Sequence, residues 1–212
     1  MKPFVKNILF CVIAILGDLF TSFMAYKLQL PCFLDTEFAV AITLYMGLIP
    51  GLIVAASFNP LMIVLLCRYT GTPFSFYDCL YAICGMLIVF VTWLFSRNKR
   101  EFLYSRIMTV LYLLIIVVVS SVFSFTSASL LDTFVLPLFQ TSTGFSAFDN
   151  FSEVMRQLKM GTFFSYLVPR IPLTVNDRLI CTFAGFGLYR LLVKLDDFQF
   201  AKFRQTNITA EE

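Results

Sequence analysis

Charged side chains are absent from three long stretches of the chain. The uncharged runs cover residues 38–67, 79–96 and 107–131, and residues 111–119 are apolar at every position. A helix needs roughly 20 largely apolar residues to cross about 30 Å of hydrocarbon. A membrane β-strand would instead alternate apolar and polar residues over a short segment. The pattern therefore predicts an all-α integral membrane protein.

The same pattern predicts six membrane spans. We expect residues 1–195 to form a six-helix membrane domain and residues 196–212 to form a short polar cytoplasmic tail. The start of the chain is similar to a secretion signal, but Asp18 interrupts its apolar part and no small-residue cleavage site follows, so we interpret it as the first span. The expected spans are 7–26, 38–49, 51–67, 78–96, 105–126 and 178–194.

The run 38–67 decides the number of spans. It is longer than one crossing needs, and the sequence Gly47-Leu48-Ile49-Pro50-Gly51 breaks it near the middle, which favours two short helices joined by a tight turn. Lys and Arg residues collect in cytoplasmic loops. Six spans with both termini in the cytoplasm place ten basic residues inside and six outside, whereas five spans put the basic cluster at 97–106 outside. We therefore expect six spans and cytoplasmic termini.

One outer connection, at about 126–176, is too long to lack elements of its own. We expect residues 130–139 to extend the fifth span or to fold back on the bundle. Residues 151–160 carry apolar and basic positions at helical spacing, which predicts a short amphipathic helix at the outer surface. Pro169 and Pro172 then favour an extended chain up to the last span.

Composition excludes several classes of protein. The chain is 59% hydrophobic and 14% charged, whereas soluble chains are about 45–50% apolar and about 25% charged. A net charge of +3 without a dense basic patch disfavours nucleic-acid binding. With no His and with six Cys that lack CxxC spacing, we expect no metal site and no disulfide. Because GxxxxGK[ST], GxSxG and HExxH stretches are absent, we expect no enzyme, no catalytic residue and no cofactor.

Three stretches carry a resemblance to a transporter family. They are PCFLDTEF at 31–38, YMGLIPGLIVA at 45–55 and IPLTVNDR at 171–178, which runs on into FAGFGLYR at 183–190. With six short spans in 212 residues, the chain resembles the substrate-binding S components of energy-coupling-factor (ECF) vitamin transporters. The small residues of its first span lack the AxxxA-like spacing by which that family commonly docks on its energising subunit.

The resemblance implies a multi-pass protein of the plasma or inner membrane. It would bind a small nutrient, typically a vitamin, and hand it to a transmembrane coupling subunit driven by a pair of ATPases. An S component itself binds its ligand and performs no chemistry. Similar six-helix modules also serve as sensory inputs of signalling proteins, so the alternative is a membrane sensor or scaffold that does not transport.

Polar residues at membrane depth are the candidates for ligand binding. Such residues are expensive in lipid and therefore face the interior of a bundle. We expect a site in the outer half, beneath the connection 27–37 and beside the start of the last span. The candidate residues are Asp18, Asp35, Glu37, Asn59, Asn176, Asp177 and Arg178.

Each candidate also has a structural interpretation. Asp18 can pair with a basic residue such as Arg178 or Arg170, and Asn59 can bond across helices or to carbonyls freed by the proline that follows it. The acidic residues at 35–37 can instead cap the second span, and residues 174–177 can form a capping box for the last one. Capping and ligand binding can coexist, so both interpretations remain open.

Overall fold

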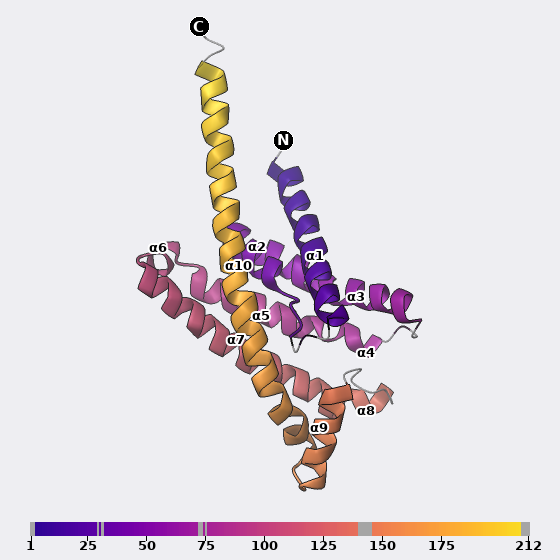
Figure 1. Ribbon diagram of the computed structural model, residues 1–212. Helices are drawn as coiled ribbons and strands as arrows, with labels where there is room; N and C mark the ends of the chain where they lie inside the picture. Colours follow the sequence, from indigo (N-terminus) through magenta and orange to yellow (C-terminus); the bar gives the residue numbers. More distant parts are fainter. Residues whose placement is uncertain are drawn as a thin grey trace.

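The structure is a computed structural model that describes residues 3–28, 30, 32–71, 74, 76–139 and 146–208 (Figure 1). These residues form helices joined by short connections and contain no strand, which confirms the all-α prediction. The helices are α1 (Pro3–Lys27), α2 (Glu37–Met46), α3 (Leu48–Thr70), α4 (Phe76–Cys79), α5 (Ala82–Ser96), α6 (Lys99–Phe102), α7 (Arg106–Phe134), α8 (Leu136–Phe139), α9 (Ser146–Gln157) and α10 (Thr162–Ile208).

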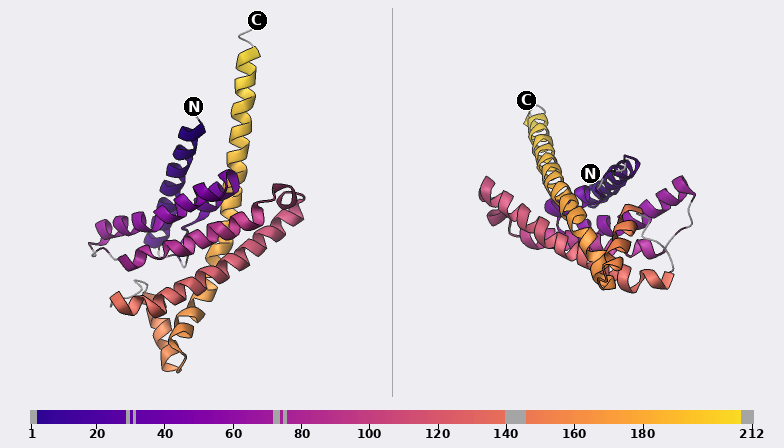
Figure 2. Two further views of the ribbon diagram at one scale, coloured as in Figure 1. Left: turned by 180° about the vertical axis from the view of Figure 1, so that it is seen from behind. Right: turned by 60° about the horizontal axis from the view of Figure 1, so that its bottom comes forward.

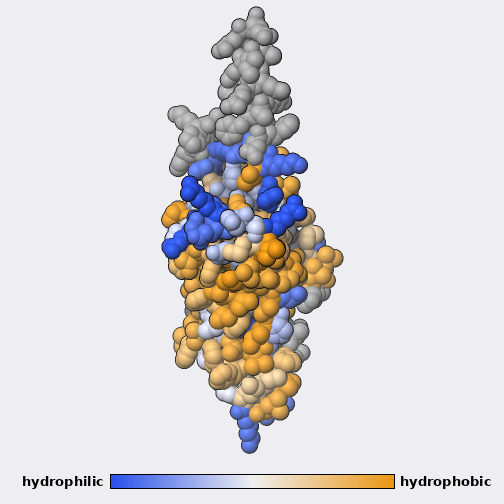
Figure 3. Space-filling model, turned by 90° about the vertical axis from the view of Figure 1, so that its left-hand side faces the viewer, coloured by the Kyte–Doolittle hydropathy of each residue, from blue (hydrophilic) through white to orange (hydrophobic). Residues whose placement is uncertain are grey.

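Four segments are long and apolar enough to cross a membrane. They are Lys6–Lys27, Leu48–Thr70, Phe76–Ser96 and Arg106–Leu138. On the face shown in Figure 3, hydrophobic side chains form a broad belt, and a hydrophilic band borders it on the side of the C-terminal end of α10. The protein is therefore a membrane protein, whereas the number of six membrane spans and the cytoplasmic location of the termini remain predictions.

Helix α2 is short but lies at the centre of the fold. Its ten residues reach about 15 Å, half the thickness of the hydrocarbon. Residues 39–44 are all buried, and Val40 and Leu44 belong to a core cluster with residues of α5, α6, α7 and α10. Figures 1 and 2 show α3, α5 and α7 running side by side, with α10 crossing α7 and the start of α1 at the same end as the end of α10.

The turn between α2 and α3 confirms that residues 38–67 form two helices. Gly47 has a φ of +98°, a left-handed value that favours glycine, and its N–H donates to Thr43 O at 3.0 Å. The turn lies earlier than the sequence suggested, because α3 begins at Leu48 and holds Pro50 in its first turn. Proline is tolerated there since the first N–H groups of a helix have no intrahelical acceptor.

The prediction of an extended segment before the last span is wrong. Helix α10 runs without a break from Thr162 to Ile208 and contains both Pro169 and Pro172. Between the two prolines, Arg170 makes two hydrogen bonds to the buried Asp132 of α7. This tertiary contact holds the segment against α7, which offsets the helix-breaking tendency of the prolines.

The other expected elements of the long connection are present. Helix α7 extends past 126 to Phe134 and α8 follows it, as expected for residues 130–139. Helix α9 covers Ser146–Gln157 and confirms the short helix, which starts and ends earlier than the predicted 151–160. The helical structure of α10 also continues to Ile208, into the segment expected to be a tail.

We predict that the α2–α3 turn depends on close approach at Gly51. A Cβ atom there would collide with the side chain of Thr43 and lie 3.0 Å from Val89 Cγ1. Gly51→Leu should therefore lower the free energy of unfolding by about 1–3 kcal/mol, the usual cost of overpacking a core. Thermal unfolding of the purified protein measures the change.

Gly187→Leu is the matched control. Gly187 also lies in a helix, but a Cβ atom there would meet nothing within 4 Å among the described residues. A Gly51→Leu protein as stable as Gly187→Leu would show that the turn does not pack as described.

The orientation of the protein in the membrane can be tested, because the basic residues Lys6 and Lys99 both contact the later part of α10. Lys6 Nζ donates to Asp196 Oδ1 at 2.7 Å, and Lys99 Nζ lies 5.4 Å from the ring of Tyr189 in α10. If this end is cytoplasmic, a cysteine at Arg100 should resist an impermeant thiol reagent on intact cells, whereas one at Leu158 in the outer connection should react.

The labelling requires a background in which Cys32 is replaced by Ser. Lysed cells, in which both introduced cysteines should react, provide the control for accessibility. Labelling of intact cells at position 100 but not at position 158 would show that the protein has the opposite orientation.

Candidate functional site

The guanidinium of Arg178 joins α10 to the connection that precedes α2. Arg178 is only 2% exposed. Its Nη1 donates to Thr36 Oγ1 at 2.5 Å, and its Nη2 donates to Asp35 Oδ1 at 2.5 Å and also to the neighbouring Asp177. One buried cation thus binds two of the carboxylates that the sequence singled out.

Asp177 fixes the backbone of the same connection. Its Oδ1 accepts hydrogen bonds from the N–H groups of Phe33 at 2.7 Å and of Leu34 at 3.0 Å. Leu34 has a φ of +46°, which is rare for a residue with a side chain, and its carbonyl accepts from Thr21 Oγ1 of α1 at 3.0 Å. Hydrogen bonds on both sides of Leu34 therefore hold a strained backbone between α1 and α10.

Asp18 caps α2 from a different helix. Its Oδ1 accepts from Phe38 N at 2.9 Å and its Oδ2 from Ala39 N at 3.1 Å. Thr36, at the N-cap position itself, makes no capping bond with its side chain. Of the interpretations left open, Asp18 is thus a helix cap rather than the partner of a basic residue. Capping of the N–H groups of Phe38 and Ala39 thus comes from α1 and not from the side chain of Thr36.

Several buried polar atoms beside Arg178 have no hydrogen-bond partner among the described residues. They are Glu37 Oε2, Arg178 Nε and Thr182 Oγ1. Glu37 is 5% exposed, and its carboxylate interacts electrostatically with Asp35, Asp177 and Arg178. Buried polar atoms are nearly always hydrogen-bonded, so these atoms mark an incompletely satisfied region.

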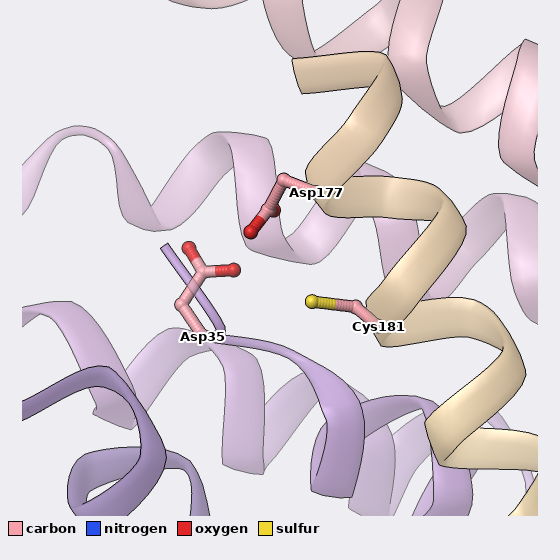
Figure 4. A group of neighbouring side chains, drawn as sticks. All are labelled: Asp35, Asp177 and Cys181. Atoms are coloured by element: carbon pink, nitrogen blue, oxygen red, sulfur yellow. The ribbon is translucent and has the colours of Figure 1, made fainter. Parts of the chain in front are cut away.

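We call this region the Arg178 cluster and define it as Asp35, Thr36, Glu37, Asp177, Arg178, Cys181 and Thr182. Figure 4 shows the side chains of Asp35, Asp177 and Cys181 pointing toward one another, the first from the connection and the others from α10. One carboxylate oxygen of each Asp and the Sγ of Cys181 all lie within 4.8 Å of one another. Loss of water around Asp35 raises the pKa of its carboxyl group above the ordinary value, although Arg178 acts in the opposite direction.

Two of the predicted site residues lie apart from these contacts. Asn176 is exposed on α10, and Asn59 is half-buried on α3. Five of the seven, namely Asp18, Asp35, Glu37, Asp177 and Arg178, meet where α1, α2 and α10 converge. Cys181 and Thr182 were missed, because a cysteine and a threonine in an apolar helix carry no signal until the facing residues are known.

A second ionic cluster was also missed. Asp132 of α7 is fully buried, and Arg170 donates to its Oδ2 from Nε at 3.1 Å and from Nη2 at 2.5 Å. Tyr77 OH donates to its Oδ1 at 2.5 Å, and Tyr81 OH donates to the same oxygen. We call these four residues the Asp132 cluster. The available signal was a lone acid after the uncharged run 107–131, the same signal that revealed Asp18.

A third charged contact joins the beginning of α1 to the later part of α10. Asp196 Oδ1 accepts from Lys6 Nζ at 2.7 Å, and its Oδ2 accepts from Tyr45 OH. The hydrogen bond from Lys6 holds the pKa of Asp196 below its ordinary value. This contact links α1 and α2 to α10 at Asp196.

An apolar groove of about 370 Å³ lies elsewhere, on α7, and is lined by Leu114, Ile115, Val118 and Val119. Its lining offers no group that could orient a polar ligand, so it is not the candidate site. Comparison of the chain with protein-family models, with curated proteins and with solved structures gave no match. The candidate site therefore rests on its own geometry.

The geometry predicts effects of different size for two substitutions in the Arg178 cluster. Arg178→Gln should lower the free energy of unfolding by about 3–5 kcal/mol, because it leaves the buried Asp177 and the partly exposed Asp35 without their cation. Glu37→Gln should change it by less than about 1 kcal/mol, because Glu37 Oε2 loses no described partner. Thermal or denaturant unfolding in detergent measures both, with the exposed Arg100→Gln as control. An Arg178→Gln protein as stable as Arg100→Gln would show that the ion pairs do not stabilise the fold.

Proposed function

We propose that the protein is a membrane binding subunit for the uptake of a small nutrient, working with a separate coupling complex driven by ATP. The Arg178 cluster is its binding site. The resemblance to S components of ECF transporters supports a vitamin or another micronutrient as the ligand, and the plasma or inner membrane as the location. The subunit binds, and partner subunits hydrolyse ATP.

One observation carries the proposal: the polar atoms of the Arg178 cluster are not all satisfied from within the chain. Glu37 Oε2, Arg178 Nε and Thr182 Oγ1 are buried without a described partner, in a protein whose other strongly buried charges are bonded. An unsatisfied buried polar group costs about 1–3 kcal/mol. A ligand that bonds to these atoms would recover that free energy on binding.

The connection before α2 supports the same proposal. It passes over the cluster, and the side chain of Asp35 is 24% exposed, so the cluster reaches the surface at this residue. The connection is held by side chains of α1 and α10 rather than by its own secondary structure. Opening of this segment over a ligand would break these side-chain contacts but would not unfold a helix.

A sensor or scaffold is the second candidate, and two observations favour it. Arg178, Asp177 and Asp18 all make hydrogen bonds within the chain, which a purely structural cluster would also do. In addition, α10 carries the cluster and continues as one helix to Ile208. A helix that leaves the cluster without a break could connect it to a partner signalling protein.

Two measurements test the uptake proposal. Mass spectrometry should find a small molecule retained by the purified wild-type protein and reduced in Glu37→Gln, which removes the charge of the carboxylate whose Oε2 has no described partner. Cells should accumulate that molecule only when the coupling subunit and the ATPase pair are co-expressed.

Glu153→Gln, an exposed carboxylate on α9, is the control and should retain the molecule. Accumulation that persists without the energising subunits would refute ATP-driven uptake. Retention without any accumulation would favour the sensor.

A further inference from the structure

The described side chains of α9 expose large apolar groups on one side of the helix. Phe151, Val154 and Leu158 are 47%, 49% and 66% exposed. The N–H of Leu158 donates to Val154 O at 3.1 Å, so the helical turn continues through this residue. At about 100° per residue, the three side chains fall within a sector of about 60°. We call these three residues the α9 apolar face.

A second side of α9 packs against α10. Ser152 is buried, and Arg156 Nη2 donates to Tyr166 OH of α10, with the guanidinium carbon 5.0 Å from the centre of the tyrosine ring. Ser152 and Arg156 are four residues apart and therefore point in similar directions, about 120–160° away from the centre of the α9 apolar face. The apolar face thus points away from α10.

A third side of α9 is polar. Glu153 and Gln157, again four residues apart, are exposed and point about 120° away from the centre of the α9 apolar face, on the side opposite to Ser152. The carboxylate of Glu153 pairs with Arg156 at 3.8 Å. One side on protein, one exposed apolar side and one exposed polar side are the arrangement expected of a helix that lies where protein, lipid and water meet.

The residue that binds Arg156 locates α9 relative to the membrane. Tyr166 belongs to a buried cluster with Tyr77 and Leu136. Tyr77 is the second residue of one segment that is long and apolar enough to cross a membrane, and Leu136 is the third-last residue of another. Both segments therefore end beside Tyr166, which places Arg156 and α9 at the membrane surface. Figures 1 and 2 show α9 beside the start of α10, at the end of the molecule far from the C-terminus.

Lipid fits the α9 apolar face better than a second protein does. The face lies where two apolar membrane segments end, so it continues the surface that these segments present to lipid. A stable protein–protein interface buries roughly 800 Å² on each partner, which is much more than three side chains provide. A lipid surface requires no such area, because α7 and α10 already hold α9 beside the membrane.

We propose that the α9 apolar face inserts into the adjacent leaflet of the membrane, with Phe151 and Val154 in contact with the upper part of the acyl chains. Interfacial helices of this kind lie about 5–10 Å into the boundary between headgroups and acyl chains. Leu158 is followed by the exposed Lys159, so this end of the face borders water. The insertion fixes α9 and, through Arg156, the first turns of α10. It is independent of what the Arg178 cluster binds.

A single tryptophan can report the surroundings of each side of α9. The chain contains one tryptophan, Trp93, so Trp93→Phe provides a background without any. In this background the purified full chain carries Val154→Trp on the apolar side or Gln157→Trp on the polar side. Each variant is placed in phosphatidylcholine nanodiscs, which leave both membrane surfaces accessible. The probes are bromine atoms on the upper acyl chains and iodide ions in the water.

Tryptophan at position 154 should be quenched by brominated lipid at least about twofold more than tryptophan at position 157, because the two positions lie on the lipid and water sides of an interfacial helix. Iodide should give the opposite order. Phe151→Trp repeats the measurement at a second position of the apolar face and should behave as Val154→Trp does.

Two results would overturn the insertion. The first is the same ratio of lipid to iodide quenching on the apolar and polar sides. The second is a tryptophan at positions 151 and 154 that neither probe quenches, which would show that a protein, such as a second copy of the chain, covers the face instead of lipid.

Discussion

Both ends of α2 are satisfied by charged side chains from other helices, and the fold depends on this. At the N-terminus, Asp18 of α1 accepts from two backbone N–H groups. At the C-terminus, Lys99 Nζ donates to Leu44 O at 2.7 Å. The carboxylate and the ammonium have the signs that oppose the helix dipole. A ten-residue helix buried among apolar helices would otherwise expose its terminal backbone groups to an environment without water.

The two ionic clusters on α10 differ in how completely they are bonded. Both oxygens of Asp132 accept from neighbouring side chains, so that cluster fixes α4, α7 and α10 relative to one another. The Arg178 cluster, eight residues further along α10 and about 12 Å away along its axis, leaves polar atoms of Glu37 and Thr182 without described partners. This difference between the two clusters supports the proposal that the ligand binds at the Arg178 cluster.

Sequence patterns predicted those features that depend on local composition. The apolar runs predicted the helices, Gly47 and Pro50 predicted the break between α2 and α3, and the buried position of Asp18 followed from its place inside an apolar segment. Features that depend on tertiary contacts were not predictable. The pairing of Arg170 with Asp132 keeps two prolines within a helix, and the capping role of Asp18 requires knowledge of which helix end it meets. Neither partner is indicated by spacing along the chain.

Because α10 is one unbroken helix, a small rotation at the Arg178 cluster would move its C-terminal end by a larger distance. From residue 178 to residue 208 the helix extends about 45 Å at 1.5 Å per residue. If the helix tilts as one rod, a rotation of about 5° about the cluster displaces its far end by about 4 Å. The coupling also acts in the opposite direction, so that a partner bound to the end of α10 would change the geometry around Arg178. By thermodynamic reciprocity, such a partner would alter the affinity of the cluster by the same factor by which the ligand alters the affinity for the partner.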